Sequence, residues 1–169
     1  MFHVFHRKEG WKYHKKGETR LTLNARMMGI NFTIFILLIS INSSILRVDQ
    51  FLTMQLILSM PFLYTSSLAR SRMSYTSHPV QEQRWDILGW LTFLIGYTFT
   101  LDCIGLLTAH YVAPYLAIVF FVANWILSIS YALIEIWNDP KYWTERVVKE
   151  SAFIVLQVFF GLLPALGLY

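Results

Sequence analysis

Five long apolar stretches follow one another along the chain, and they constrain the fold more than any other feature. A hydrocarbon core of about 30 Å requires about 20 helical residues at a rise of 1.5 Å per residue. Because 56% of the 169 residues are hydrophobic, the composition also departs from that of a soluble domain. We therefore predict an all-α integral membrane protein. The predicted spans are residues 27–46, 51–69, 87–109, 113–136 and 151–169.

The domain organisation follows from these spans. Residues 27–169 are predicted to form one transmembrane domain, a bundle of five helices, and residues 1–26 a basic cytoplasmic lead segment. The lead segment is expected to form a small hairpin or an amphipathic segment resting on lipid headgroups. Its cations are candidate contacts for anionic headgroups, each contributing about 1 kcal/mol near the surface, or they serve only to orient the chain. These candidate residues are Lys12, Lys15, Lys16 and Arg20.

The distribution of positive charge predicts the orientation, because Lys and Arg are retained on the cytoplasmic side during insertion. Of the 14 Lys and Arg residues, only Arg47 lies in the first or third loop between spans. Five spans with a cytoplasmic N-terminus and an external C-terminus account for all the others, in a plasma or inner membrane. The rival interpretation has four spans, since the last stretch contains Gly161, Pro164 and Gly167, which are unfavourable in a helix interior.

Several functional classes find no support in the sequence. The nucleophile-elbow, zinc-protease and phosphate-loop motifs are all missing, so an enzyme is the less favoured class. Cys103 is the single cysteine, which excludes an internal disulfide and a metal site built from cysteines. We expect no metal and no other cofactor. The net charge of +4 is explained by topology and predicts no nucleic-acid partner.

Asp102 is the residue that most needs an explanation. It lies within the third predicted span, where an ionised carboxylate carries an insertion penalty of up to about 3 kcal/mol. Protonation offsets this penalty, as does pairing with Arg47 at the outer end of the first span or with His110 two helical turns further along. An intramembrane carboxylate indicates a proton relay, a cation site or a catalytic group, or a buried contact between helices.

Other polar residues within the spans recur at helical spacing. One set follows the fourth span, Gln55 lies in the second, and Thr98 precedes Asp102 by about one turn. Such residues line a hydrated pathway or form hydrogen bonds between packed helices, and the sequence leaves both interpretations open. Gly89, Thr92 and Gly96 present a small-residue surface for a neighbouring helix. The candidate pathway residues are Gln55, Thr98, Asp102, Asn124, Ser128, Tyr131 and Glu135.

Three functional hypotheses follow. The first is a channel-like or transport-related protein in which Asp102 serves a pathway for cations or protons. The second is a non-catalytic membrane partner or assembly subunit that binds other helices and anionic lipid. The third is an intramembrane enzyme that modifies lipid, using Asp102 and His110. A chain of this size encloses little interior, so we also expect a homo-oligomer or a place in a larger membrane complex.

Overall fold

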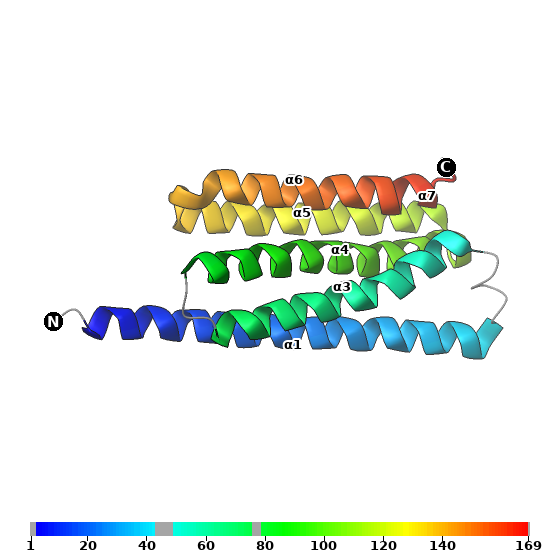
Figure 1. The fold of residues 1–169 in the computed structure, drawn as a ribbon. Helices are drawn as coiled ribbons and strands as arrows, with labels where there is room; N and C mark the ends of the chain where they lie inside the picture. The colour runs from blue at the N-terminus through cyan, green and yellow to red at the C-terminus, as the bar shows by residue number, and fades with distance from the viewer. Residues whose placement is uncertain (1–2, 43–48, 76–78, 169) are drawn as a thin grey trace. The chain divides into compact units, whose positions relative to one another are not determined.

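The computed structural model describes residues 3–42, 49–75 and 79–168, and these residues form helices joined by turns, without a strand (Figure 1). The last helix changes its winding towards its C-terminal end. The elements are α1 (His3–Asn42), α3 (Gln50–Tyr75), α4 (Pro79–Tyr111), α5 (Pro114–Asn138), the 3₁₀ turn η1 (Pro140–Tyr142), α6 (Trp143–Gln157), the π-helical turn η2 (Val158–Leu162) and α7 (Leu163–Ala165).

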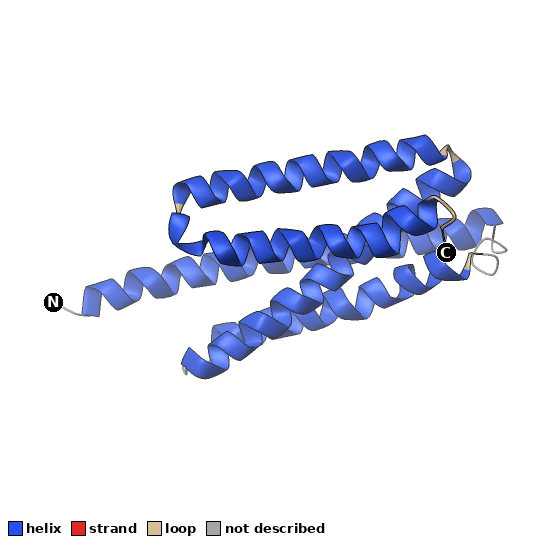
Figure 2. Ribbon diagram, turned by 90° about the horizontal axis from the view of Figure 1, so that it is seen from above, coloured by secondary structure: helices blue, strands red, loops and turns tan. Residues whose placement is uncertain are grey.

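Five helices in the described part of the chain are long and apolar enough to cross a membrane, which confirms the predicted number of candidate spans. Figure 2 shows the described chain as helices joined by short connections. The chain is thus an all-helical protein suited to multiple membrane crossings. Its candidate spans are Leu21–Ile41, Gln50–Met73, Val80–Tyr111, Pro114–Asn138 and Trp143–Ala165.

The last of these helices begins earlier than predicted. The sequence predicts a start at Ser151, because the charged residues before it favour a loop, but α6 begins at Trp143. In the structure these charges have partners: Lys149 binds Glu145 within the helix, and Arg146 binds Glu135 of α5. Paired charges are compatible with a helix at this position because ion pairs between neighbouring turns stabilise it.

The lead segment is also more regular than predicted. Residues 3–20 continue α1 as a helix, so the hairpin interpretation is wrong. The side chains of residues 1–20, including those of Lys12, Lys15, Lys16 and Arg20, lie outside the described part, as does all of Arg47.

The contacts divide the chain into two compact units. The first unit contains Met1–Asp49 and Leu56–Tyr97, and the second contains Gln50–Gln55 and Thr98–Tyr169. Both α3 and α4 contribute to each unit.

In the first unit, α3 and α4 approach closely at Gly96. A Cβ atom added there would lie 2.9 Å from Cγ of Leu63 and 3.1 Å from the backbone oxygen of Ser59. Only a residue without a side chain permits this backbone separation. The expectation that a helix packs on this small-residue surface is therefore confirmed, and the helix is α3.

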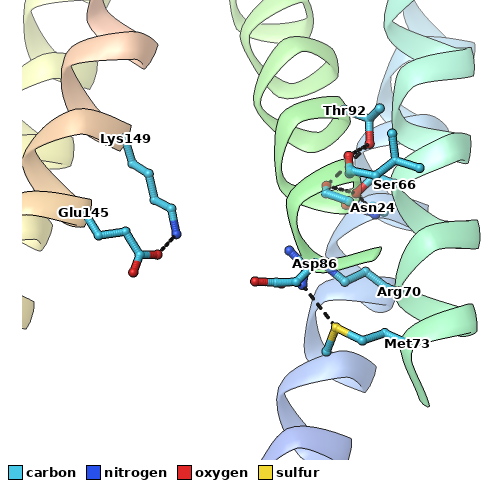
Figure 3. Close-up of polar contacts among 10 residues, drawn as sticks. Asn24, Ser66, Arg70, Met73, Asp86, Thr92, Glu145 and Lys149 are labelled. Carbon is cyan, nitrogen blue, oxygen red and sulfur yellow. Dashed lines mark hydrogen bonds and ion pairs between the residues drawn. The ribbon is translucent and has the colours of Figure 1, made fainter. Parts of the chain in front are cut away.

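Polar side chains join the helices of the first unit. Nδ2 of Asn24 donates to Oγ of Ser66 at 3.1 Å, and that hydroxyl donates to the backbone oxygen of Gly89 at 2.8 Å (Figure 3). Near the same end of the unit, the buried guanidinium of Arg70 pairs with Asp86. These bonds stabilise helix packing in the manner expected of polar residues between apolar helices.

In the second unit, α5 and α6 form an antiparallel hairpin, visible in both ribbon views (Figures 1 and 2). Residues later in α5 pair with residues earlier in α6, which is the register of antiparallel neighbours. The three pairs are Trp125 with Gln157, Ser128 with Glu150, and Glu135 with Arg146.

Candidate functional site: a buried polar cluster around Asp102

The carboxylate of Asp102 is fully buried in the second unit. Its residue is 0% exposed, and neither carboxylate oxygen has a hydrogen-bond partner. Thr98 precedes Asp102 by one turn of α4, is also 0% exposed, and its Oγ1 likewise lacks a partner. Each unpaired buried polar group lowers the free energy of unfolding by on the order of 1–3 kcal/mol. Asp102 and Thr98 therefore destabilise the fold unless they bind something else.

The backbone of η2 faces Asp102 at Gly161. A Cβ atom added to Gly161 would come closer than 3.0 Å to Oδ1 of Asp102 and would lie 2.6 Å from Cζ of Phe121. The ring of Phe121 also reaches Gly105 of α4, where an added Cβ would lie 2.7 Å from Cε2. Two glycines therefore make room for one aromatic ring and for the carboxylate beside it.

The helix widens beside this carboxylate. The backbone N–H of Leu163 donates to the oxygen of Val158, five residues earlier, which is the hydrogen bond of a π-helix. Such single π-turns occur frequently at functional sites. The side chain of Gln55, in α3, donates from Nε2 to the backbone oxygen of Phe160, the residue before Gly161. Gln55 and Asp102 are thus both held against η2.

Two hydrogen bonds fix the orientation of two buried glutamine amides in the second unit. Because a carbonyl only accepts, Gln55 must present Nε2 to Phe160, and its Oε1 is left without a partner. Because an indole N–H only donates, Gln157 must present Oε1 to Nε1 of Trp125, at 2.8 Å, and its Nε2 is left without a partner.

These side chains define what we name the Asp102 cluster: Gln55, Thr98, Asp102 and Gln157. All four residues are 0% exposed. Their atoms without a hydrogen-bond partner are Gln55 Oε1, Thr98 Oγ1, Asp102 Oδ1, Asp102 Oδ2 and Gln157 Nε2. The oxygens of an ionised Asp102 and of the Gln55 amide only accept, Nε2 of Gln157 only donates, and the Thr98 hydroxyl does either. A positively charged species would balance the charge of the carboxylate.

The polar side chains predicted on one face of α5 bond within α5 and to α6. Ser128 donates to Glu150 of α6, and Glu135 pairs with Arg146 of α6 at 2.6 Å. Asn124 and Tyr131 bond within α5, to the oxygen of Phe120 at 3.0 Å and to Glu135 at 2.7 Å. The hydrogen bonds and the ion pair of these four side chains thus lie within the α5–α6 hairpin.

The two predicted partners of Asp102 have different outcomes. Arg47 lies outside the described residues. His110 is exposed at the end of α4, with its ring centroid 6.5 Å from that of Tyr111, and it makes no hydrogen bond to Asp102.

Sequence reasoning missed the contribution of α6. Gln157 and Gly161 lie one turn apart, and Arg146 and Glu150 continue the same face towards the start of the helix. The spacing of four, seven and four residues between them is typical of one helix face. The helix predicted from Ser151 excludes two of these residues.

The described residues contain no group of three or more His, Cys, Asp or Glu side chains placed to hold a metal ion. Taken together, fold and site define an all-helical protein with five candidate membrane spans and a buried cluster of polar side chains whose atoms lack hydrogen-bond partners. No protein-family model matches the sequence, and comparisons with curated proteins and with solved structures also give no match.

Proposed function

We propose that this protein is a multi-pass membrane protein that carries protons or small cations, with Asp102 as the carboxylate that binds them. One observation carries the proposal: the carboxylate of Asp102 is 0% exposed and has no hydrogen-bond donor. A charged group within a membrane-spanning segment is costly, and such residues commonly mark ion or proton pathways.

Burial favours a small ligand over the two alternatives. A partner helix binds a surface, and the carboxylate of Asp102 is closed off by α4, η2 and Phe121. A lipid-modifying enzyme would need Asp102 and His110 to meet one substrate, yet one side chain is buried and the other exposed. A proton or a bare cation is small enough to reach a carboxylate in this setting.

We further propose that the N-terminus is cytoplasmic and the C-terminus external, in a plasma or inner membrane, with the basic end of α1 at anionic headgroups. The distribution of Lys and Arg along the chain supports this orientation. Asp102 then lies nearer the external end of α4 and Asp86 nearer its cytoplasmic end.

Flux measurements on reconstituted vesicles test the proposal. Asp102→Asn keeps the shape of the side chain and removes its charge, so we expect proton or cation flux to fall at least about tenfold, equivalent to about 1.4 kcal/mol. The matched control is Asp139→Asn, at an exposed position in the turn after α5, which should leave flux unchanged. Flux in Asp102→Asn equal to that of the unaltered protein, with equal amounts inserted, would contradict the proposal.

A further inference from the structure

We infer that the Asp102 cluster binds a dehydrated monovalent cation of the sodium class, through oxygens of Asp102, Thr98 and Gln55. This inference rests on the proposed function, since it assigns the ligand of the same site. The inference adds the charge of the ligand and the neutral residues, Thr98 and Gln55, that bind this ligand beside Asp102.

The unpartnered oxygens around a buried carboxylate point to a cation. Four oxygens of the cluster have no hydrogen-bond partner, and one of them, the Thr98 hydroxyl, can donate as well as accept. A proton on Asp102 would neutralise the carboxylate without drawing the other oxygens together as ligands. A metal cation accepts several oxygen ligands at once, and it therefore satisfies the cluster in a way that a single proton does not.

The side-chain orientations support this assignment. The amide nitrogen of Gln55 donates to the backbone oxygen of Phe160, so the amide atom without a partner is the oxygen Oε1. Thr98 lies one turn from Asp102 on the same face of α4. Side chains of α3 and α4 thus carry three chemically different kinds of buried oxygen, and none of these oxygens has a hydrogen-bond partner within the fold.

The charge of the cluster selects a monovalent ion. Asp102 is the one ionisable side chain among its four residues, so a single positive charge neutralises the site. Divalent ions are usually held by more than one carboxylate or by carboxylates with several waters. Imidazole and thiolate ligands, which suit transition metals, are missing from the cluster.

The backbone of η2 packs directly against the carboxylate. Gly161 carries no side chain where the carboxylate of Asp102 meets η2, and a Cβ atom added there would come closer than 3.0 Å to Oδ1 of Asp102. Phe160, whose oxygen is held by Gln55, lies next to it in the π-helical turn. This turn therefore joins Gln55 to the carboxylate.

Thermal unfolding of the purified full chain in detergent, at constant ionic strength, tests the inference. Na⁺, K⁺ and Li⁺ are titrated against a bulky organic cation, because a ligand that binds only the folded state raises the unfolding temperature. We expect at least one of the three ions to raise it. Thr98→Val and Gln55→Met should each weaken the apparent affinity about tenfold, as expected for loss of one ligand to a charge, and Asp102→Asn should abolish the response.

Thr108→Val is the matched control. Its hydroxyl is committed to the oxygen of Ile104 at 2.8 Å in the same helix, so this substitution should leave the ion response unchanged. The quantity compared between variants is the shift in unfolding temperature that the ion causes. A variant that only loses packing unfolds at a lower temperature but keeps this shift, whereas a variant that loses an ion ligand loses the shift.

The possible outcomes distinguish the inference from the proposed function. Flux that requires Asp102, in a protein whose unfolding none of the three ions affects, would overturn the cation and leave a proton carrier. An ion response retained by Thr98→Val and Gln55→Met would overturn the ligand assignment. A response abolished by Asp102→Asn, in a protein that carries no flux, would support the cation site and overturn transport.

Discussion

Gly161 shows at the scale of one residue how the site depends on a missing side chain. Its Cα faces the carboxylate of Asp102 and the ring of Phe121, with no space for a methyl group between them. The carboxylate therefore lies directly against helix backbone. The residue that shapes the site is thus not itself polar.

Gly161→Ala should destabilise the protein by about 1–3 kcal/mol, because the added methyl overpacks a filled interior. The control is Gly29→Ala, where nothing lies within 4 Å of an added Cβ and where alanine improves helix propensity by about 1 kcal/mol. Thermal or denaturant unfolding in detergent measures both. Equal stability of the two variants would show that the approach of η2 to Asp102 is looser than described.

At the scale of helices, α6 shows what the sequence does and does not predict. The five helices were predictable because the length of an apolar run is a local property. That Thr98 and Asp102 share one helix face was also predictable, because their spacing of four residues is a local property. The spacing of Gln157 and Gly161 indicates one helix face, but which helix faces Asp102 depends on packing between residues far apart in the chain, so the approach of Gly161 to Asp102 was not predictable.

The start of α6 was missed for a related reason. Glu145, Arg146 and Lys149 indicate a loop when they are considered singly. Their partners make them compatible with a helix, and one of those partners, Glu135, lies in α5. A charge that is paired across helices cannot be told from a solvated one without knowing which helices are neighbours.

The pair of Glu135 and Arg146 gives a prediction for the α5–α6 hairpin. Both side chains are partly buried, so Arg146→Glu should lower stability by about 1 kcal/mol through repulsion. Exchanging the charges, as Glu135→Arg with Arg146→Glu, should restore most of the loss. Unfolding measurements on the two single variants and the double variant give the coupling energy. Additive losses would contradict a direct contact between these residues.

At the scale of the whole molecule, the proposed topology is five membrane crossings with the two ends of the chain on opposite sides. The turns that follow α4 and α5 should therefore be exposed on opposite faces. Cys103 is fully buried, so it should not react with a membrane-impermeant thiol reagent. Single cysteines can therefore be introduced into the otherwise unaltered chain as reporters of sidedness.

Val112→Cys, in the turn after α4, should react with an impermeant maleimide added to intact cells. Asp139→Cys, in the turn after α5, should react only after the membrane is permeabilised. Both positions are exposed in the structure, so burial does not limit either reaction. The reverse pattern would invert the proposed orientation, and labelling of both in intact cells would exclude a membrane crossing by α5.

The central claim, that a cation binds the carboxylate of Asp102, is tested most directly by infrared difference spectroscopy of the reconstituted protein with and without Na⁺. Binding should change the carboxyl vibrations, and Asp102→Asn should remove that change while Asp139→Asn retains it. A difference spectrum that is unaltered in Asp102→Asn, or one without any carboxyl band in the unaltered protein, would contradict the claim.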